Sequence, residues 1–219
     1  MSQNQPDGYL ALPANGYGRP VLVLHPWWGL NDTIKNVCTR LAEAGFVAFA
    51  PDLFRGEVTD TIPGAEALAE VAFGRSDEVS AEVAQAAAFV LERAGQAERG
   101  VAVIGFSFGA WFALELSTTH PELVHSVVVF YGARPVDDYD RSQARYLGHF
   151  AETDEYESQE DIDETENALR DAGRPVTFHN YPGTGHWFFE PDRTDAYHAD
   201  SARLAWERTL DFLAGSADS

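Results

Sequence analysis

The stretch Val101-Ala102-Val103-Ile104-Gly105-Phe106-Ser107-Phe108-Gly109 decides the fold. Its first half is apolar and rich in β-branched residues, which is typical of a buried strand. Residues 110–116 follow directly and are typical of a helix. A Gly-x-Ser-x-Gly segment between a strand and a helix predicts a sharp turn with the serine at its apex. The sequence therefore indicates a nucleophile elbow at Ser107.

The two glycines of this segment have a physical reason. The backbone at the apex is strained, and the strand and helix approach each other closely there. Only residues as small as Gly105 and Gly109 fit such an approach. The serine then lies at a helix N-terminus, where free N–H groups and the helix dipole can stabilise a developing oxyanion.

Strand-like and helix-like segments alternate along the whole chain. Besides the strand that enters the elbow, we expect strands over residues 9–12, 20–25, 46–50, 124–131, 144–150 and 175–180. We expect helices over residues 33–44, 77–94, 161–172 and 195–214, and a loop with a short helix over residues 54–75. This pattern predicts a single domain over residues 1–219, with loose ends at 1–7 and 215–219. Its core is a mostly parallel sheet of about seven or eight strands with helices on both faces.

The order of these elements, with the elbow serine near the middle, predicts an α/β-hydrolase fold. A dinucleotide-binding fold also alternates, but it needs a Gly-x-Gly-x-x-Gly turn after its first strand. The chain has His25-Pro26-Trp27-Trp28-Gly29 at that position. The sequence therefore disfavours a nucleotide fold.

The formal net charge is −20, and Lys35 is the only lysine among fifteen basic residues. Such a surface repels nucleic acid and anionic membranes, so we expect neither as a partner. A more specific interpretation of the same negative charge is that the protein is adapted to high salt. The single cysteine, Cys38, excludes an internal disulfide and fits a reducing cytoplasm. No signal peptide or membrane-spanning run is apparent, so we expect a cytoplasmic protein.

A serine hydroxyl needs a base to remove its proton and an acid to orient that base. In this fold the acid and then the histidine follow the serine along the chain. His186 fits as the base, because it lies in the glycine-rich loop after the last strand. The acid is expected in the acidic loop after the penultimate strand, where Asp154 is the best placed. The other candidates are Glu152, Glu155 and Glu157.

Two backbone N–H groups are expected to form the oxyanion hole. One belongs to Phe108, which directly follows the serine. The other is expected from Trp27, because Pro26 has no N–H to give. The side chains expected to form the substrate pocket are those of Trp28, Phe54, Tyr131 and Trp187. For the tryptophans, ordinary packing over the sheet edge is the alternative.

Taken together, these motifs resemble the dienelactone hydrolase family of α/β-hydrolases. The resemblance rests on His25-Pro26-Trp27-Trp28-Gly29-Leu30-Asn31, Ala50-Pro51-Asp52-Leu53-Phe54, Gly105-Phe106-Ser107-Phe108-Gly109 and Tyr181-Pro182-Gly183-Thr184-Gly185-His186-Trp187-Phe188-Phe189. It implies a hydrolase of small esters or lactones without a large cap domain. Ser107, Asp154 and His186 match the positions of the family's catalytic triad.

Three departures from the family bear on the substrate. Members that cleave dienelactone carry cysteine where this chain has Ser107, and a glutamate where it has Pro26. They bind the substrate carboxylate with an arginine shortly after the histidine, where this chain offers Glu190. We expect Glu190 to repel an anionic lactone. A neutral or cationic ester is therefore the expected substrate.

The sequence predicts a serine-dependent carboxylic ester or lactone hydrolase that acts through an acyl-enzyme. We expect no metal or organic cofactor, since no His, Cys and carboxylate cluster has ligand spacing. We expect a monomer or homodimer whose partner is a small-molecule ester or lactone. The alternatives are a lyase or perhydrolase with the same triad, or a binding or regulatory protein on the same scaffold.

Overall fold

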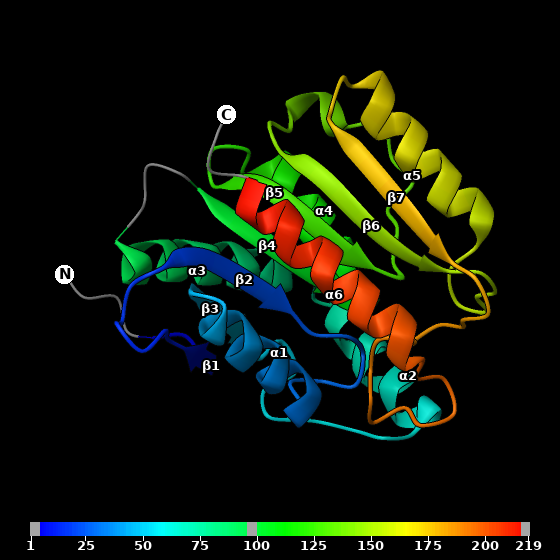
Figure 1. The fold of residues 1–219 in the computed structure, drawn as a ribbon, viewed down its shortest axis with the longest axis horizontal. Helices are drawn as coiled ribbons and strands as arrows, with labels where there is room; N and C mark the ends of the chain where they lie inside the picture. The colour runs from blue at the N-terminus through cyan, green and yellow to red at the C-terminus, as the bar shows by residue number, and fades with distance from the viewer. Residues whose placement is uncertain (1–4, 96–99, 216–219) are drawn as a thin grey trace.

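The computed structural model describes residues 5–95 and 100–215, and within them seven strands form one sheet (Figure 1). The strands are β1 (Gly8–Ala11), β2 (Arg19–Leu24), β3 (Phe46–Pro51), β4 (Val101–Phe106), β5 (Val124–Phe130), β6 (Arg145–Ala151) and β7 (Val176–Tyr181). Their order in the sheet is β1-β3-β2-β4-β5-β6-β7. Only β1 pairs antiparallel, with β3, and the other neighbours pair in parallel. The predicted, mostly parallel sheet is confirmed.

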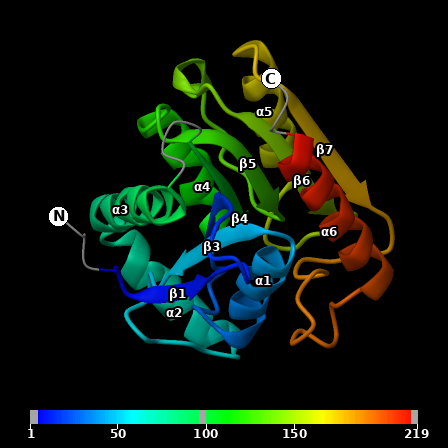
Figure 2. The same ribbon diagram turned by 60° about the vertical axis from the view of Figure 1, so that its left-hand side comes forward.

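Helices cover both faces of this sheet, as the sequence predicts (Figures 1 and 2). On one face lie α1 (Asp32–Glu43) and α6 (Ala199–Ala214), whose buried residues belong to the same apolar cluster as Val21 and Val23 of β2. On the other face lie α3 (Ser76–Ala94), α4 (Phe108–Thr119) and α5 (Gln159–Asp171), whose buried residues belong to the same apolar cluster as Leu22 and Leu24. Successive residues of a strand point to opposite faces, so one apolar strand supplies both cores.

Helix α1 shows how the local sequence produces its element. The side chain of Asn31 accepts a hydrogen bond from the Ile34 N–H at 3.1 Å and caps the helix N-terminus. The apolar face of this predicted helix, which includes Ile34, Val37 and Cys38, is buried. Burial raises the pKa of the Cys38 thiol to about 12. Cys38 is therefore an unreactive core residue, as its place in the helix predicts.

Two predicted segments differ in detail. The excursion over residues 54–75 contains α2 (Ile62–Phe73), twelve residues long. The last helix begins at Ala199 and not at residue 195, because residues 194–196 form a turn, in which the N–H groups of Ala196 and Tyr197 donate to the carbonyl of Arg193. His198 was expected inside this helix, but its side chain caps it by accepting from the Ser201 N–H. The predicted loose ends, residues 1–7 and 215–219, lie largely outside the described residues.

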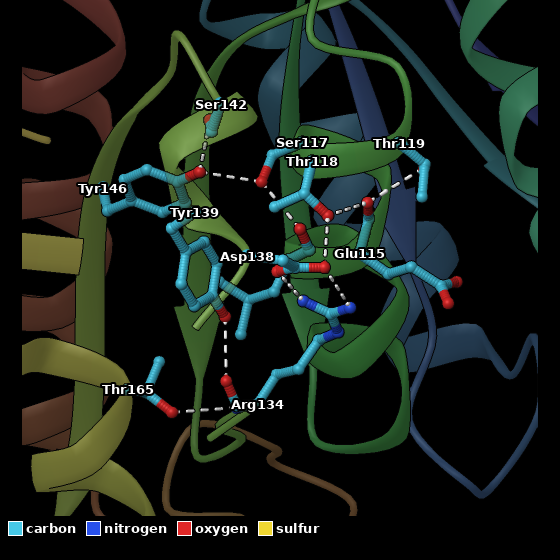
Figure 3. Close-up of polar contacts among 11 residues, drawn as sticks. Glu115, Ser117, Thr118, Thr119, Arg134, Asp138, Tyr139, Ser142, Tyr146 and Thr165 are labelled. Atoms are coloured by element: carbon cyan, nitrogen blue, oxygen red, sulfur yellow. Dashed lines mark hydrogen bonds and ion pairs between the residues drawn. The ribbon is translucent and has the colours of Figure 1, made fainter. Parts of the chain in front are cut away.

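A buried polar network fixes the short connection between β5 and β6 (Figure 3). The guanidinium of Arg134 donates two hydrogen bonds to Asp138, at 2.8 and 3.0 Å. Thr118 of α4 also donates to Asp138, and the Tyr139 hydroxyl donates to the Arg134 carbonyl at 2.9 Å. Tyr139 begins the single turn η2 (Tyr139–Arg141). This connection is therefore held down on α4, and the described residues contain no cap domain above the sheet.

No helix in the described ranges is both long enough and apolar enough to cross a membrane.

Candidate active site

Ser107 lies between β4 and α4 in a strained backbone conformation, with φ 47° and ψ −111°. A positive φ is rare for a residue with a side chain, and strain of this kind is found at functional sites. The turn is fixed from both sides. The Ser107 N–H donates to the Phe130 carbonyl at 2.9 Å, and the Ser107 carbonyl accepts from the Ala110 N–H at 2.8 Å. The predicted sharp turn at Ser107 is present.

The flanking glycines are required by close approaches. A Cβ on Gly105 would lie 2.6 Å from the Ala110 Cα, where β4 meets α4. A Cβ on Gly109 would lie 2.4 Å from the Leu24 carbonyl oxygen, at the end of β2. Real Cβ atoms do not come this close to backbone atoms, so only glycine fits at either position. The first turn of α4 consequently lies against the end of β2, where the Pro26–Trp27 segment begins.

The three side chains predicted as a triad form one hydrogen-bonded chain. The Ser107 Oγ lies 3.0 Å from the His186 Nε2. The His186 Nδ1 lies 2.8 Å from Oδ1 and 2.7 Å from Oδ2 of Asp154. The imidazole is 4% exposed and the Asp154 carboxylate 5% exposed, so bulk water is largely kept from both. The distances and the burial suit proton transfer between the serine and the imidazole.

The loop after β6 presents Asp154 and not one of the other acidic candidates. The Asp154 Oδ1 accepts hydrogen bonds from the N–H groups of Tyr156 and Glu157, each at 2.9 Å. Glu152 accepts from the Gly183 N–H at 2.8 Å, and Glu157 accepts from the Ala133 N–H at 2.9 Å. Those two glutamates hold neighbouring loops together, while the backbone orients Asp154 toward His186.

The loop after β7 places the imidazole. The Thr184 Oγ1 donates to the Tyr181 carbonyl at 2.7 Å, and the Thr184 carbonyl accepts from the Thr153 N–H at 3.2 Å. The ring of Tyr131 lies 4.8 Å from the ring of His186. Two loops and one aromatic ring thus hold His186 over the elbow.

The remaining histidines do not reach Ser107. His149 is buried inside β6 and hydrogen-bonds to the hydroxyls of Tyr181 and Thr209. Burial lowers its pKa well below the usual value, so it is a neutral structural residue, as its position in a strand predicts. His179 lies inside β7, as predicted, and His198 is exposed at the start of α6.

His25 has a structural role that the sequence analysis missed. It is fully buried at the end of β2, and burial lowers its pKa to about 4, so the ring is neutral. Its Nδ1 lies 2.7 Å from the Pro26 carbonyl oxygen and donates to it, while its Nε2 accepts from the Leu53 N–H at 3.1 Å. Only the folded chain brings Leu53 to this ring, so no local sequence signal identifies the role.

These bonds fix the peptide between Pro26 and Trp27. In a planar trans peptide the C=O and N–H groups point in opposite directions. Because the Pro26 carbonyl points toward His25, the Trp27 N–H points away from it. Neither this N–H nor that of Phe108 donates to another described residue. Both predicted oxyanion donors are thus left available beside the elbow.

The predicted pocket side chains differ in their placement. Tyr131 is 0% exposed and Trp28 is 1% exposed, so the expectation that they contact substrate is corrected. Trp28 is covered by the guanidinium of Arg193, 4.1 Å from its ring, and by Trp187. Phe54 is buried against the rings of His25 and Phe108. These three side chains support the site from within the core, because they fill the space between the loops and the sheet.

Trp187 is a predicted pocket residue that borders open space. Together with His186 it lines a cavity of about 480 Å³ between the loops after β6 and β7. Tyr156 lines the same cavity, and its ring lies 4.9 Å from that of Trp187. The sequence analysis did not single out Tyr156. It lies two residues beyond Asp154, which was the only available signal.

Glu190 does not face the cavity, so the expected repulsion of an anionic substrate by this residue is wrong. It is fully buried, and its Oε1 accepts a hydrogen bond from the Tyr131 hydroxyl at 2.6 Å. Burial raises the pKa of the Glu190 carboxyl to about 8. The Tyr131–Glu190 hydrogen bond instead holds in place the Tyr131 ring, which packs on His186.

Within the described residues, no group of three or more His, Cys, Asp or Glu side chains is arranged to hold a metal ion.

Comparisons with known proteins agree with this geometry. The family model described as "Dienelactone hydrolase family" matches residues 7–216. "Protein usf" of Aquifex pyrophilus is 32% identical over 212 residues, covering 94% of this chain and 91% of its own. The solved structure "m3DLH" has a TM-score of 0.80 at 26% identity, covering 91% of this chain and 88% of that one. MGS-M1, an α/β-hydrolase enzyme from a deep-sea metagenome, has a TM-score of 0.68 at 17% identity, covering 94% and 88%. The predicted α/β-hydrolase fold is confirmed.

Proposed function

Because the chain belongs to the dienelactone hydrolase family, we propose that it hydrolyses small carboxylic esters or lactones with Ser107 as the nucleophile. The observation that carries the proposal is the chain of hydrogen bonds from Ser107 through His186 to Asp154, at 3.0 and 2.7 Å. A serine on a strained elbow, an imidazole nitrogen within hydrogen-bond distance and a buried carboxylate are the parts that acyl transfer requires.

The first half of the reaction forms an acyl-enzyme. The Ser107 Oγ attacks the carbonyl carbon, and its proton passes to the His186 Nε2. Asp154 stabilises the resulting imidazolium through Nδ1–H. The carbonyl oxygen becomes negative and accepts hydrogen bonds from the N–H groups of Trp27 and Phe108. The bond to the leaving oxygen then breaks, and His186 gives that oxygen its proton.

The second half releases the acid. A water molecule loses a proton to His186 and attacks the acyl carbon, again through a tetrahedral intermediate at the oxyanion donors. The bond to Ser107 breaks, and the proton held by His186 returns to the serine oxygen. The balance is one ester and one water consumed for one acid and one alcohol formed.

The absence of a cap domain over the described residues favours short acyl groups over long lipids. A cytoplasmic location, cofactor-free catalysis and a monomeric or homodimeric state stay predictions.

The test is Ser107→Ala, assayed on p-nitrophenyl acetate and probed with a fluorophosphonate. We expect ester turnover to fall by about 10³-fold or more and labelling to be lost. Ser201→Ala, in the first turn of α6, is the matched control and should keep both. Near-normal turnover by a folded Ser107→Ala protein would overturn the assignment. Wild-type protein that is neither labelled nor active would favour the binding or regulatory alternative.

A further inference from the structure

The cavity beside His186 has an unusual combination of walls. Its lining includes Glu152, Glu155, Tyr156, Thr184 and Trp187, and it holds about 480 Å³. No lysine or arginine lines it. The walls are therefore aromatic and acidic, with no basic group to neutralise them locally.

The cavity borders His186, the residue that handles the proton of the leaving group. In the proposed reaction His186 delivers its proton to the oxygen that departs. That oxygen must then lie near the Nε2 of His186, and the group attached to it extends past the imidazole. The cavity is lined by His186 and not by Ser107, so it is placed for the part of the leaving group that extends beyond the departing oxygen.

Four rings, one of them the imidazole of His186, meet at this place. The ring of Tyr156 lies 5.2 Å from that of His186, 5.2 Å from that of Trp27 and 4.9 Å from that of Trp187. Tyr156 is 43% exposed, so part of its ring is open to a ligand. The faces of Trp and Tyr rings carry partial negative charge and attract cations, quaternary ammonium groups above all.

Two carboxylates, those of Glu152 and Glu155, line the same cavity. Glu152 is held in place by the Gly183 N–H, and Glu155 has no ion-pair partner among the described residues. Partial burial, followed by the negative charges of Glu155 and Glu66, raises the pKa of the Tyr156 hydroxyl. An ammonium group in the cavity would reduce the mutual repulsion of these charges.

We propose that this cavity binds an alkylammonium group on the leaving alcohol, so that the preferred substrates are esters of amino alcohols. The proposal rests on the serine hydrolase function proposed above and adds the substrate class. The cation lies against Tyr156 and Trp187, with Glu152 and Glu155 beside it. Attack by Ser107 then releases the amino alcohol, which takes its hydroxyl proton from His186.

A matched pair of esters tests the substrate class. One is 2-(trimethylammonio)ethyl acetate, and the other is 3,3-dimethylbutyl acetate, in which carbon replaces the charged nitrogen. We expect kcat/KM to favour the cation by about tenfold at low salt. The preference should shrink at 1 M NaCl, because salt screens the carboxylates more than the ring contact.

Variants separate the contribution of the aromatic rings from that of the carboxylates. Tyr156→Leu and Glu155→Gln should each lower the preference about threefold or more, and Tyr156→Phe should keep it because the ring remains. Glu164→Gln is the matched control, since it removes one exposed carboxylate of α5 that does not line the cavity. It should leave the preference unchanged.

A binding measurement gives a readout that does not require turnover. Choline is titrated into the Ser107→Ala protein while tryptophan fluorescence reports on Trp27 and Trp187. We expect choline to bind saturably, and we expect Tyr156→Leu to weaken this binding. Absence of binding up to about 100 mM choline, or equal kcat/KM for the two esters, overturns the cation site while leaving the hydrolase function intact. Loss of fluorophosphonate labelling and of turnover on all esters would instead defeat the hydrolase function.

Discussion

The two sides of Ser107 are built in different ways. On the oxyanion side, the end of β2 packs against α4, and His25 is fully buried with both ring nitrogens bonded. On the cavity side, Tyr156 and Glu155 belong to a surface loop and remain exposed. Groups that must stabilise a charge in a fixed place are held by burial. Groups that select the substrate lie in an exposed loop, where their side chains can be substituted without loss of core packing.

The largest expected effect on turnover comes from replacing Asp154, the acid predicted to orient His186. Asp154→Asn keeps the side-chain shape but replaces the acceptor of the Nδ1–H bond, so His186 adopts the wrong tautomer. We expect kcat on p-nitrophenyl acetate to fall by about 10³- to 10⁴-fold. Glu155→Gln, one residue away, should keep kcat on this neutral ester within about twofold. A mild effect of Asp154→Asn would show that Asp154 does not serve as the acid.

The oxyanion side is tested by His25→Phe, which keeps a buried ring but removes both hydrogen bonds. The Pro26–Trp27 peptide is then free to rotate, and we expect kcat to fall by about 10- to 100-fold. The free energy of unfolding should also drop by about 1–3 kcal/mol, because the Leu53 N–H loses its partner in the core. Both are measured on the same preparation, by esterase kinetics and urea unfolding.

His149→Phe is the control for that comparison, because it also removes a buried histidine with two hydrogen bonds. It should lose stability and retain kcat, since its partners belong to β7 and α6. If the two variants lose kcat equally, the loss reflects general destabilisation and not the orientation of the Trp27 peptide.

The smallest expected effect on turnover concerns the support beneath His186, where the change appears in the pH dependence of stability. Glu190 has its pKa raised from 4.5 to about 8, so the native state holds a proton that the unfolded chain releases between these values. Wild-type stability should therefore fall as the pH rises from about 4.5 to 8, with a slope of at most about 1.4 kcal/mol per pH unit from this group. Glu190→Gln removes this contribution while keeping an acceptor for Tyr131.

Urea unfolding at pH 5, 7 and 9 measures that slope. Glu164→Gln, with an exposed carboxyl, serves as the control and should follow the wild-type curve. Identical pH profiles for wild type and Glu190→Gln would mean that Glu190 is ionised in the native state throughout this range.

Much of this protein follows from its sequence. The segment 101–109 predicts both the strand and the helix around Ser107, because a strained turn between close elements leaves glycine as the only residue that fits. The alternation of apolar strands and amphipathic helices gives the parallel sheet. Chain order then indicates His186, since the loops after successive parallel strands gather at one edge of the sheet. These inferences need only local patterns and the topology.

Other features were decided only by the tertiary structure. Four carboxylates in one acidic loop were candidates, and the backbone N–H groups of that loop bring Asp154 to His186. Glu190 was expected to face the substrate, yet it lies buried against Tyr131. The role of His25 depends on Leu53, 28 residues away in sequence. A local pattern specifies backbone conformation, but the partner and burial of a polar side chain depend on which distant segments pack around it.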